Sequence, residues 1–399
     1  MRSNYKKLGQ FIRVVDTRNK ENRKDNLLGV STQKVFIDSV ANTVGTDFKK
    51  YKIVRKHQFT YVPDTSRRGD KMGIAMLESL DQALVSQAYT VFEVKDSNLL
   101  DPEYLMMWFR RPEFDRYARF KSHGSVREIF DWQEMCDVEL PVPSIEKQRE
   151  IVREYNVVNE RIVLNEQLTQ KLEDTAQAIY KQWFVDFEFP ISKEYAQSIG
   201  KPELEGKPYK SSGGEMEYCD KSMQEIPKGW KVETYEECFS FKTGKLNSNA
   251  AVVDGEYPFF TCSAETYKTN TFAFDGQAVL LAGNNASAIY PLKYYEGKFD
   301  AYQRTYVITP KSKNVSLLQI YFAVKSELEG FKGTSSGTAT KFLTMKILNP
   351  LNTVVAPKGV CDVVNNQLNT ILKHLLVLLK ELELLNELNP ILLAKISKG

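Results

Sequence analysis

One carboxylate–lysine pattern in the first half of the chain has a spacing that fits catalysis. Asp64 follows one strand-like run, and Glu93 and Lys95 lie two residues apart in another. Residues two apart share a strand face, and in metal-dependent nucleases such acids hold Mg²⁺ while the lysine assists the attacking water. In the second half Thr309 and Lys311 take the corresponding places, so the acid is not repeated. An exposed ion pair at a strand end is the simpler interpretation, and a metal-dependent nuclease remains an alternative.

Other catalytic signatures do not occur in the sequence. There is no G-x-G-x-x-G, phosphate-binding loop or H-E-x-x-H motif, and a histidine-based triad could draw only on His57, His123 and His374. The cysteines are odd in number and form no C-x-x-C pair, which predicts neither a disulfide framework nor a zinc site. We therefore expect a function based on binding, without a metal or cofactor on this chain.

Basic and polar residues gather in loop-like segments, where their chemistry suits a polyanion such as DNA. Lysine and arginine contact phosphates, and arginine, asparagine and glutamine also read base edges. Candidates in the first half are Arg18, Lys20, Arg23, Lys24, Lys49, Lys50, Lys52, Arg67, Arg68, Lys71, Arg116, Arg119, Lys121, His123 and Ser125. Candidates in the second half are Lys242, Lys245, Asn247, Asn249, Asn284, Asn285, Thr334, Ser335, Ser336, Thr338 and Lys341. Arg67 and Arg68, beside a glycine, are the best base-reading candidates, although ordinary solvated surface remains the alternative for each cluster.

Two heptad helices, one behind each globular half, are the elements that would position these loops. Interleaved apolar rows at steps of four and three form the seam of a coiled coil. The same phase recurs 213 residues later, as expected of a duplicated unit. The seam comprises Ile151, Tyr155, Val158, Ile162, Leu172 and Ile179, then Val364, Leu368, Ile371, Leu375, Leu378, Leu382 and Leu385. Asn165 and Asn389 interrupt the rows and either set the register or lie at solvated positions.

Composition divides the chain into two α/β (α+β) domains, each followed by a long helix. The predicted segments are a first domain over 1–143, a helix over 144–189, a polar linker over 190–229, a second domain over 230–356 and a helix over 357–399. Strand-like runs and a late helix follow one another in the same order in both domains, which predicts two copies of one fold. Pro390 should kink or break the second helix, because proline lacks the N–H that a helix interior needs.

Length and composition are those of a chain with two or three globular domains. The 399 residues are 42% hydrophobic and 26% charged, as in soluble globular proteins. No run approaches the roughly 20 apolar residues of a membrane span, and no long apolar run follows the first basic residues, so a secretory signal is not expected. We predict a cytoplasmic location.

Three segments resemble the specificity subunits of type I restriction-modification systems. Residues 140–148, Leu-Pro-Val-Pro-Ser-Ile-Glu-Lys-Gln, resemble the proline-rich lead into that family's first conserved helix. Residues 180–190 are similar to the usual end of this helix, and 226–230, Ile-Pro-Lys-Gly-Trp, look like the start of a target-recognition domain. The lead into the second helix, 354–359, lacks the Glu-x-Gln pair of the first. The two helices therefore need not contact a partner in the same way.

This resemblance implies a DNA-binding subunit that performs no catalysis itself. Two target-recognition domains would each read one half of a bipartite double-stranded DNA target, and an antiparallel helix pair between them would act as the spacer. S-adenosylmethionine, ATP and Mg²⁺ would bind to partners, namely two methyltransferase subunits and the motor-endonuclease subunits, which perform adenine methylation and cleavage. A coiled-coil scaffold that does not bind DNA is a further alternative to the nuclease.

Overall fold

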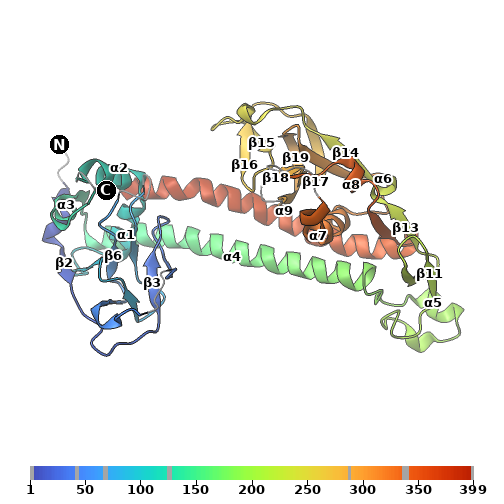
Figure 1. Ribbon diagram of the computed structural model, residues 1–399, viewed down its shortest axis with the longest axis horizontal. Helices are drawn as coiled ribbons and strands as arrows, with labels where there is room; N and C mark the ends of the chain where they lie inside the picture. Colours follow the sequence, from blue (N-terminus) through green and yellow to red (C-terminus); the bar gives the residue numbers. More distant parts are fainter. Residues whose placement is uncertain are drawn as a thin grey trace. The chain divides into compact units, whose positions relative to one another are not determined.

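The structure, a computed structural model, describes residues 4–40, 45–65, 71–123, 128–285, 289–334 and 341–396 (Figure 1). The chain divides into two compact units, which we call unit 1 (Met1–Leu164 with Leu382–Gly399) and unit 2 (Asn165–Glu381). Two long helices, α4 (Ile145–Phe184) and α9 (Lys358–Lys395), each contribute one segment to each unit. The predicted mixed α/β class with two long helices is confirmed. None of the helices in the described ranges combines the length and apolar character that a membrane span requires.

Unit 1 is built on two four-stranded sheets, β2-β9-β6-β7 and β4-β3-β8-β5. Their strands are β2 (Ile12–Val15), β3 (Leu27–Val30), β4 (Phe36–Asp38), β5 (Lys52–Arg55), β6 (Phe59–Tyr61), β7 (Ile74–Met76), β8 (Gln82–Val85) and β9 (Thr90–Val94). Helices α1 (Pro102–Arg110), α2 (Pro112–Lys121) and α3 (Trp132–Asp137) follow. Helices α1 and α2 are separate because Pro112 holds the preceding residue, Arg111, in an extended conformation.

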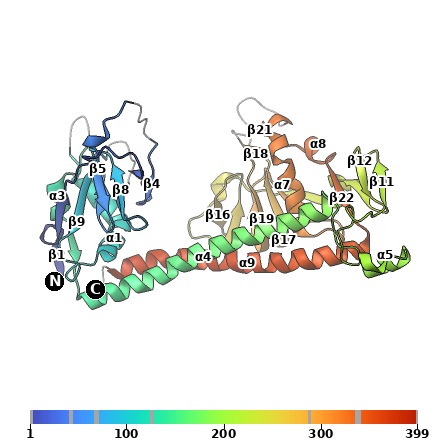
Figure 2. The same ribbon diagram turned by 90° about the horizontal axis from the view of Figure 1, so that it is seen from below.

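Unit 2 contains a six-stranded sheet in the order β14-β20-β17-β19-β15-β16. Its strands are β14 (Phe239–Thr243), β15 (Tyr257–Phe260), β16 (Thr266–Thr269), β17 (Phe274–Ala282), β19 (Leu292–Ala301) and β20 (Thr305–Pro310). Helix α7 (Leu317–Thr334) packs on β17, β19 and β20 (Figure 2). Alternate residues of β17 lie on opposite faces, since Val279 and Leu281 belong to the core cluster that includes α7, while Ala278 and Leu280 belong to another.

Both units repeat one topology. In unit 1 an initial strand, β1 (Tyr5–Lys7), pairs antiparallel with β10 (Glu139–Pro141), which leads into α4. In unit 2, β13 (Lys231–Thr234) pairs antiparallel with β22 (Asn352–Val355), which leads into α9. The antiparallel pairings of β2-β9-β6-β7 match those of β14-β20-β17-β19. The remaining elements of unit 2 are α6 (Tyr235–Cys238), β18 (Asn284–Asn285), β21 (Lys341–Phe342) and α8 (Met345–Leu348).

The segment from 190 to 229, for which composition predicts a linker, is folded. It contains α5 (Lys193–Ser198) and the hairpin of β11 (Met216–Cys219) and β12 (Gln224–Pro227). The ring of Phe189 stacks on Tyr209 at 4.6 Å and on Trp230 at 5.0 Å between centroids. These aromatic side chains join the core of unit 2, so the prolines, glycines and serines of this segment mark turns of a folded structure.

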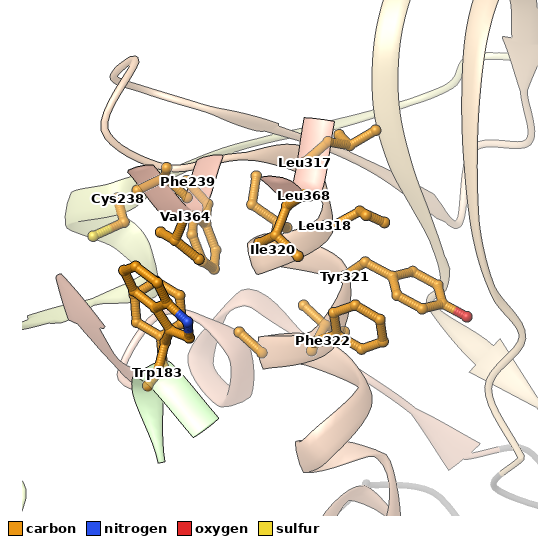
Figure 3. Packing of buried hydrophobic residues seen from close by; sticks show 14 of the residues in the cluster. Trp183, Cys238, Phe239, Leu317, Leu318, Ile320, Tyr321, Phe322, Val364 and Leu368 are labelled. Carbon is orange, nitrogen blue, oxygen red and sulfur yellow. The ribbon is translucent and has the colours of Figure 1, made fainter. Parts of the chain in front are cut away.

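The two long helices pair antiparallel, as contacts within each unit demonstrate. In unit 1 the start of α4 meets the end of α9, where Lys395 Nζ lies 2.7 Å from Glu154 Oε2. In unit 2 the end of α4 meets the start of α9, and Figure 3 shows Trp183 beside Val364 in a cluster that also holds residues of α7. Every predicted seam residue is buried or partly buried.

The polar interruptions of the seam and Pro390 behave differently from one another. Asn389 Nδ2 donates to Asn159 Oδ1 at 3.0 Å, which fits a role in register. Asn165 is 1% exposed, and neither polar atom of its side chain has a hydrogen-bond partner within the described part of the chain. Contrary to the predicted break, α9 continues through the exposed Pro390 to Lys395. The buried Leu392 and Ile396 beyond it pack into the core of unit 1, which stabilises this last segment.

The start of α4 is locked to unit 1 by Gln148, the last residue of the proline-rich lead. Gln148 is fully buried, and its Oε1 accepts from the backbone N–H of Asp101, the N-cap of α1. Its Nε2 donates to the carbonyl oxygens of Leu99 and Pro143 at 3.0 and 2.9 Å. Cys361 stands 213 residues later at the start of α9, where its thiol donates to Ala356 O. The starts of α4 and α9 are therefore held by two different side chains, those of Gln148 and Cys361.

Candidate nucleic-acid interface

Glu93 and Lys95 of the carboxylate–lysine pattern form contacts within the fold of unit 1, and Asp64 forms a backbone bridge with Ile129. Glu93 forms an ion pair with Arg13 at 2.6 Å and accepts a hydrogen bond from Gln58 Nε2 at 2.8 Å. Burial opposes ionisation of this carboxyl group, but the two hydrogen-bond donors lower the pKa of Glu93 overall. Lys95 Nζ donates to backbone oxygens of the helical turn η1 (Leu8–Gln10). Across the described ranges, no group of three or more His, Cys, Asp or Glu side chains could hold a metal ion.

Two basic clusters of unit 1 that are separate in sequence lie together in the structure. The buried Asn19 joins them, because its Nδ2 donates to Arg23 O at 2.8 Å and to Phe48 O at 3.1 Å. Arg18 Nη1 donates to Lys50 O at 2.7 Å. The segments 18–24 and 49–52 therefore form one basic surface, on which Lys20, Lys24, Lys49 and Lys50 are exposed.

Not every cation of this surface is equally suited to bind phosphate. Arg18 and Arg23 already pair with Asp16 and Glu21, at 2.9 and 2.6 Å. Lys52 Nζ donates to Tyr89 O at 2.7 Å, and burial lowers its pKa. The exposed lysines are therefore the better phosphate contacts, while Lys52 and Arg18 hold the two segments together.

The basic residues near the end of α2 are balanced by acids of the same unit. Arg116 lies 3.3 Å from Glu113, Arg119 lies 3.7 Å from Glu128, and Lys121 lies 3.4 Å from Glu134. These residues are therefore weaker candidates for phosphate contacts, because neighbouring carboxylates cancel much of the local positive potential. The exposed His123 pairs with Ile129 through backbone hydrogen bonds. Lys71 is exposed, whereas Arg67, Arg68 and Ser125 lie outside the described residues.

In unit 2 several predicted segments meet around one turn of the sheet. Lys242, Lys245, Asn247 and Asn249 are exposed at and beyond the end of β14. Asn284 and Asn285 form β18, which pairs with Lys341 and Phe342 of β21. Thr334 ends α7, and Ser335, Ser336 and Thr338 lie outside the described residues. A recess of about 320 Å³ lies between these segments and is lined by Thr243, Gly283, Gln303, Arg304, Tyr306, Phe342, Leu343 and Thr344.

Three exposed or partly exposed polar residues at this end of unit 2 were not predicted. Gln303 and Arg304 project from the turn between β19 and β20. Lys293 Nζ donates to Thr266 Oγ1 at 2.9 Å beside the ring of Phe260, and burial lowers the pKa of Lys293 to about 8. The sequence contained a signal for Arg304, because residues 87–92, Gln-Ala-Tyr-Thr-Val-Phe, align with residues 303–308, Gln-Arg-Thr-Tyr-Val-Ile, and Arg304 comes just before the strand-like run of the second segment.

Comparison with known proteins identifies the kind of domain that this surface belongs to. Residues 227–356 match the family described as Type I restriction modification DNA specificity domain. The chain is 34% identical over 151 residues to the EcoDI specificity subunit of Escherichia coli, an alignment that covers 38% of this chain and 33% of that protein. It is 26% identical over 200 residues to the HindI specificity subunit of Haemophilus influenzae, covering 48% and 43%. The matched regions thus span less than half of each relative.

A solved structure agrees with the fold. The type I restriction-modification S subunit from M. genitalium superposes with a TM-score of 0.57 at 15% identity, covering 98% of this chain and 95% of that one. Residues 227–356 thus match the specificity-domain family, and the two curated relatives are specificity subunits of type I restriction enzymes. The structural neighbour agrees with this chain in fold.

Proposed function

We propose that this chain is the non-catalytic DNA-recognition subunit of a type I restriction-modification complex and acts in the cytoplasm. Each unit would read one half of a bipartite target. The observation that carries the proposal is the repeated topology: unit 2 contains the segment that matches the specificity-domain family, and unit 1 repeats its strand pairings. Two copies of a DNA-reading fold in one chain suit a target with two half-sites.

The surface chemistry supports DNA as the ligand. Lys242 and Lys245 are exposed beside the polar recess of unit 2, and the exposed lysines at 20, 24, 49 and 50 share one surface of unit 1. Lysines of this kind bind phosphates, while asparagine, glutamine and arginine can read bases. Binding should therefore weaken steeply with added salt, because bound phosphates release counterions. A scaffold that binds only proteins has no need of such surfaces.

Catalysis would lie on partner subunits, which bring S-adenosylmethionine, ATP and Mg²⁺. We propose methyltransferase subunits, two per chain because the fold is repeated, and motor-endonuclease subunits as the partners. Exposed apolar side chains on one flank of the helix pair in unit 1 offer a surface for a methyltransferase subunit. The flank carries Val157, Leu164, Leu384, Leu388 and Ile391, which are 38–65% exposed.

These apolar residues lie on the same flank because the ion pair of Glu154 and Lys395 marks it on both helices. Val157 stands three residues after Glu154, and Ile391 stands four before Lys395. Residues three or four apart are neighbours on a helix surface. Leu384 and Leu388 continue this row along α9 at seven and three residues before Ile391.

Leu384→Glu should weaken co-purification of the chain with its methyltransferase subunit by about tenfold or more, because a carboxylate would be buried in an apolar contact. Asn386→Glu is the matched control, since Asn386 lies about 200° around the same helix and receives the same charge. Pull-down from cells that express both proteins measures the association. Equal recovery of the two variants would remove this flank as the docking surface.

Sequencing of methylated DNA tests the proposed function directly. Cells that carry the chain with its cognate methyltransferase subunit should show methylated adenines in a split, asymmetric motif. The motif should disappear when the chain is omitted. An unchanged methylation pattern would reject the DNA-specificity role and favour a protein scaffold, while Mg²⁺-dependent cleavage by the isolated chain, lost in Glu93→Ala, would favour the nuclease.

A further inference from the structure

The turn between β19 and β20 holds Arg304 on a backbone that is fixed from several sides. The turn closes with a hydrogen bond from Thr305 N to Tyr302 O at 2.8 Å. Tyr302 N donates to Phe260 O at 2.9 Å, and Gln303 N donates to Leu246 O at 3.0 Å. The carbonyl of Arg304 itself accepts from the N–H of Gly283 at 2.8 Å. Segments from β15, from the loop after β14 and from the end of β17 therefore set the position of this residue.

The side chain of Arg304 is held by an aromatic ring. Its Cζ lies 4.8 Å from the ring centroid of Phe342, in the range of a cation–π contact. The residue is exposed and lies at the recess of about 320 Å³ that Thr243, Gln303 and Thr344 also line. No ion pair joins Arg304 to a carboxylate of the described residues. The guanidinium group is thus held beside the ring of Phe342 by a cation–π contact, and its hydrogen-bond donors need acceptors from outside the chain.

We propose that Arg304 reads a guanine in the half-site bound by unit 2, an inference that rests on the proposed function. The N–H donors of a guanidinium group lie in its plane, so a cation–π contact with a ring leaves them available for hydrogen bonds. Two of these donors match the O6 and N7 acceptors that guanine presents in the major groove. Gln303, beside it on the same turn, can read a neighbouring base.

The contacts favour a base over a phosphate as the ligand of Arg304. A phosphate contact needs only a charge within reach, and the exposed Lys242 and Lys245 on the adjoining segment already supply that. Reading a base requires a fixed direction, which the pinned turn and the ring of Phe342 provide. Hydrogen-bond donors held at a fixed position discriminate strongly between bases, because a wrong base leaves these donors without acceptors.

The equivalent turn of unit 1 carries alanine at this position. Tyr89 N donates to Ser86 O at 3.1 Å, as Thr305 N does to Tyr302 O, and the strands β9 and β20 follow directly. Gln87 and Ala88 therefore correspond to Gln303 and Arg304. Unit 1 lacks this arginine, so the half-site that unit 1 would read serves as an internal control.

The test is methylation mapping of the complete complex with Arg304→Ala and Arg304→Lys. In both variants one guanine of one half-site should lose about tenfold or more of its discrimination, while the other half-site stays unchanged. Lysine keeps the charge but offers no bidentate pair. Lys298→Ala is the matched control, because Lys298 also makes a cation–π contact with a ring of unit 2, its Nζ lying 4.6 Å from the ring centroid of Phe272.

Each outcome decides the inference. A motif that becomes degenerate at a single guanine in both variants supports the inference. If Arg304→Lys keeps half or more of the discrimination that Arg304→Ala loses, the contact is a simple charge contact and the guanine assignment is wrong. An unchanged motif with slower methylation at all sites would identify a phosphate contact and overturn the guanine assignment. A wild-type complex that yields no split motif would instead overturn the proposed function. Failure of the guanine assignment is therefore distinguishable from failure of the proposed function.

Discussion

Replacing Asp115 with alanine should destabilise unit 1 by about 3–5 kcal/mol, because it leaves a buried ammonium group without its counter-charge. Lys34 is 5% exposed, and its Nζ lies 2.8 Å from Asp115 Oδ2. The same ammonium group donates to the carbonyl of Phe109 at the end of α1. Asp115 Oδ1 accepts from Met72 N at 2.9 Å, just before β7. The pair therefore ties α1, α2 and the start of β7 together.

The pH dependence of this variant follows from the lowered pKa of Lys34. Burial lowers that pKa below its usual value of 10.5, and Asp115 partly opposes the shift. Between the folded and the unfolded pKa values the unfolded chain binds more protons, so stability rises with pH there. Without Asp115 the pKa of Lys34 in the folded state falls further, and the pH range over which stability rises becomes wider. The loss of unfolding free energy in the variant should thus shrink as the pH is raised towards about 10.

Urea unfolding of the full chain at several pH values measures the effect, and hydrogen exchange localises it to unit 1. Arg116→Ala is the control on the same helix. Arg116 is exposed and pairs with Glu113 at 3.3 Å, and loss of an exposed pair should cost less than about 1 kcal/mol. If the two variants unfold alike, the ion pair of Lys34 is not buried as the structure has it.

Replacing Gly244 with alanine is expected to destabilise unit 2 by about 3 kcal/mol or more, through overpacking against a backbone. A Cβ atom at this position would lie 1.6 Å from the carbonyl oxygen of Ala301 and 2.2 Å from its carbon. Neither can move as a flexible side chain could, so the chain must shift. Ala301 directly precedes the turn that holds Arg304, and the shift should therefore also disturb recognition of the half-site that we propose for unit 2.

The same substitution at Gly359 provides the control. A Cβ atom there would meet nothing within 4 Å, and Gly359 lies in the first turn of α9. Alanine favours a helix over glycine by up to about 1 kcal/mol, so Gly359→Ala should be neutral or slightly stabilising. Thermal unfolding of both variants, with methylation mapping of each half-site, tests the pair of expectations. Native stability in Gly244→Ala would contradict the close approach of these two backbones.

Much of the fold could be predicted from periodicity. The seam residues of both helices follow a repeat that the side chains must keep if one face is to be buried, and this repeat also indicated two copies of one unit. The proline-rich lead was recognised as a pattern, whereas its physical role appeared only in the structure. Gln148 is conspicuous because it closes three backbone hydrogen bonds at the start of α4. No spacing in the sequence specifies those partners.

Predictions from local composition were wrong at two places where tertiary packing determines the structure. The segment from 190 to 229 is rich in turn residues, but Phe189 stacks on both Tyr209 and Trp230, and these rings bury the segment in the core of unit 2. Pro390 has the chemistry of a helix breaker, but Leu392 and Ile396 beyond it are buried in unit 1. In both cases burial of apolar side chains outweighs a local preference, which is worth only about 3 kcal/mol even for proline.

The sequence alone determined the two long helices, the repeated order of elements and the basic character of the loops, because these depend on residue type and on spacing along one element. Only the tertiary structure decided which cations have partners already and which remain exposed. It joined the segments at 18–24 and 49–52 through Asn19, and it placed Arg304 on Phe342. Such contacts join residues far apart in the chain, and their geometry is set by the packing of whole sheets, which no local pattern encodes.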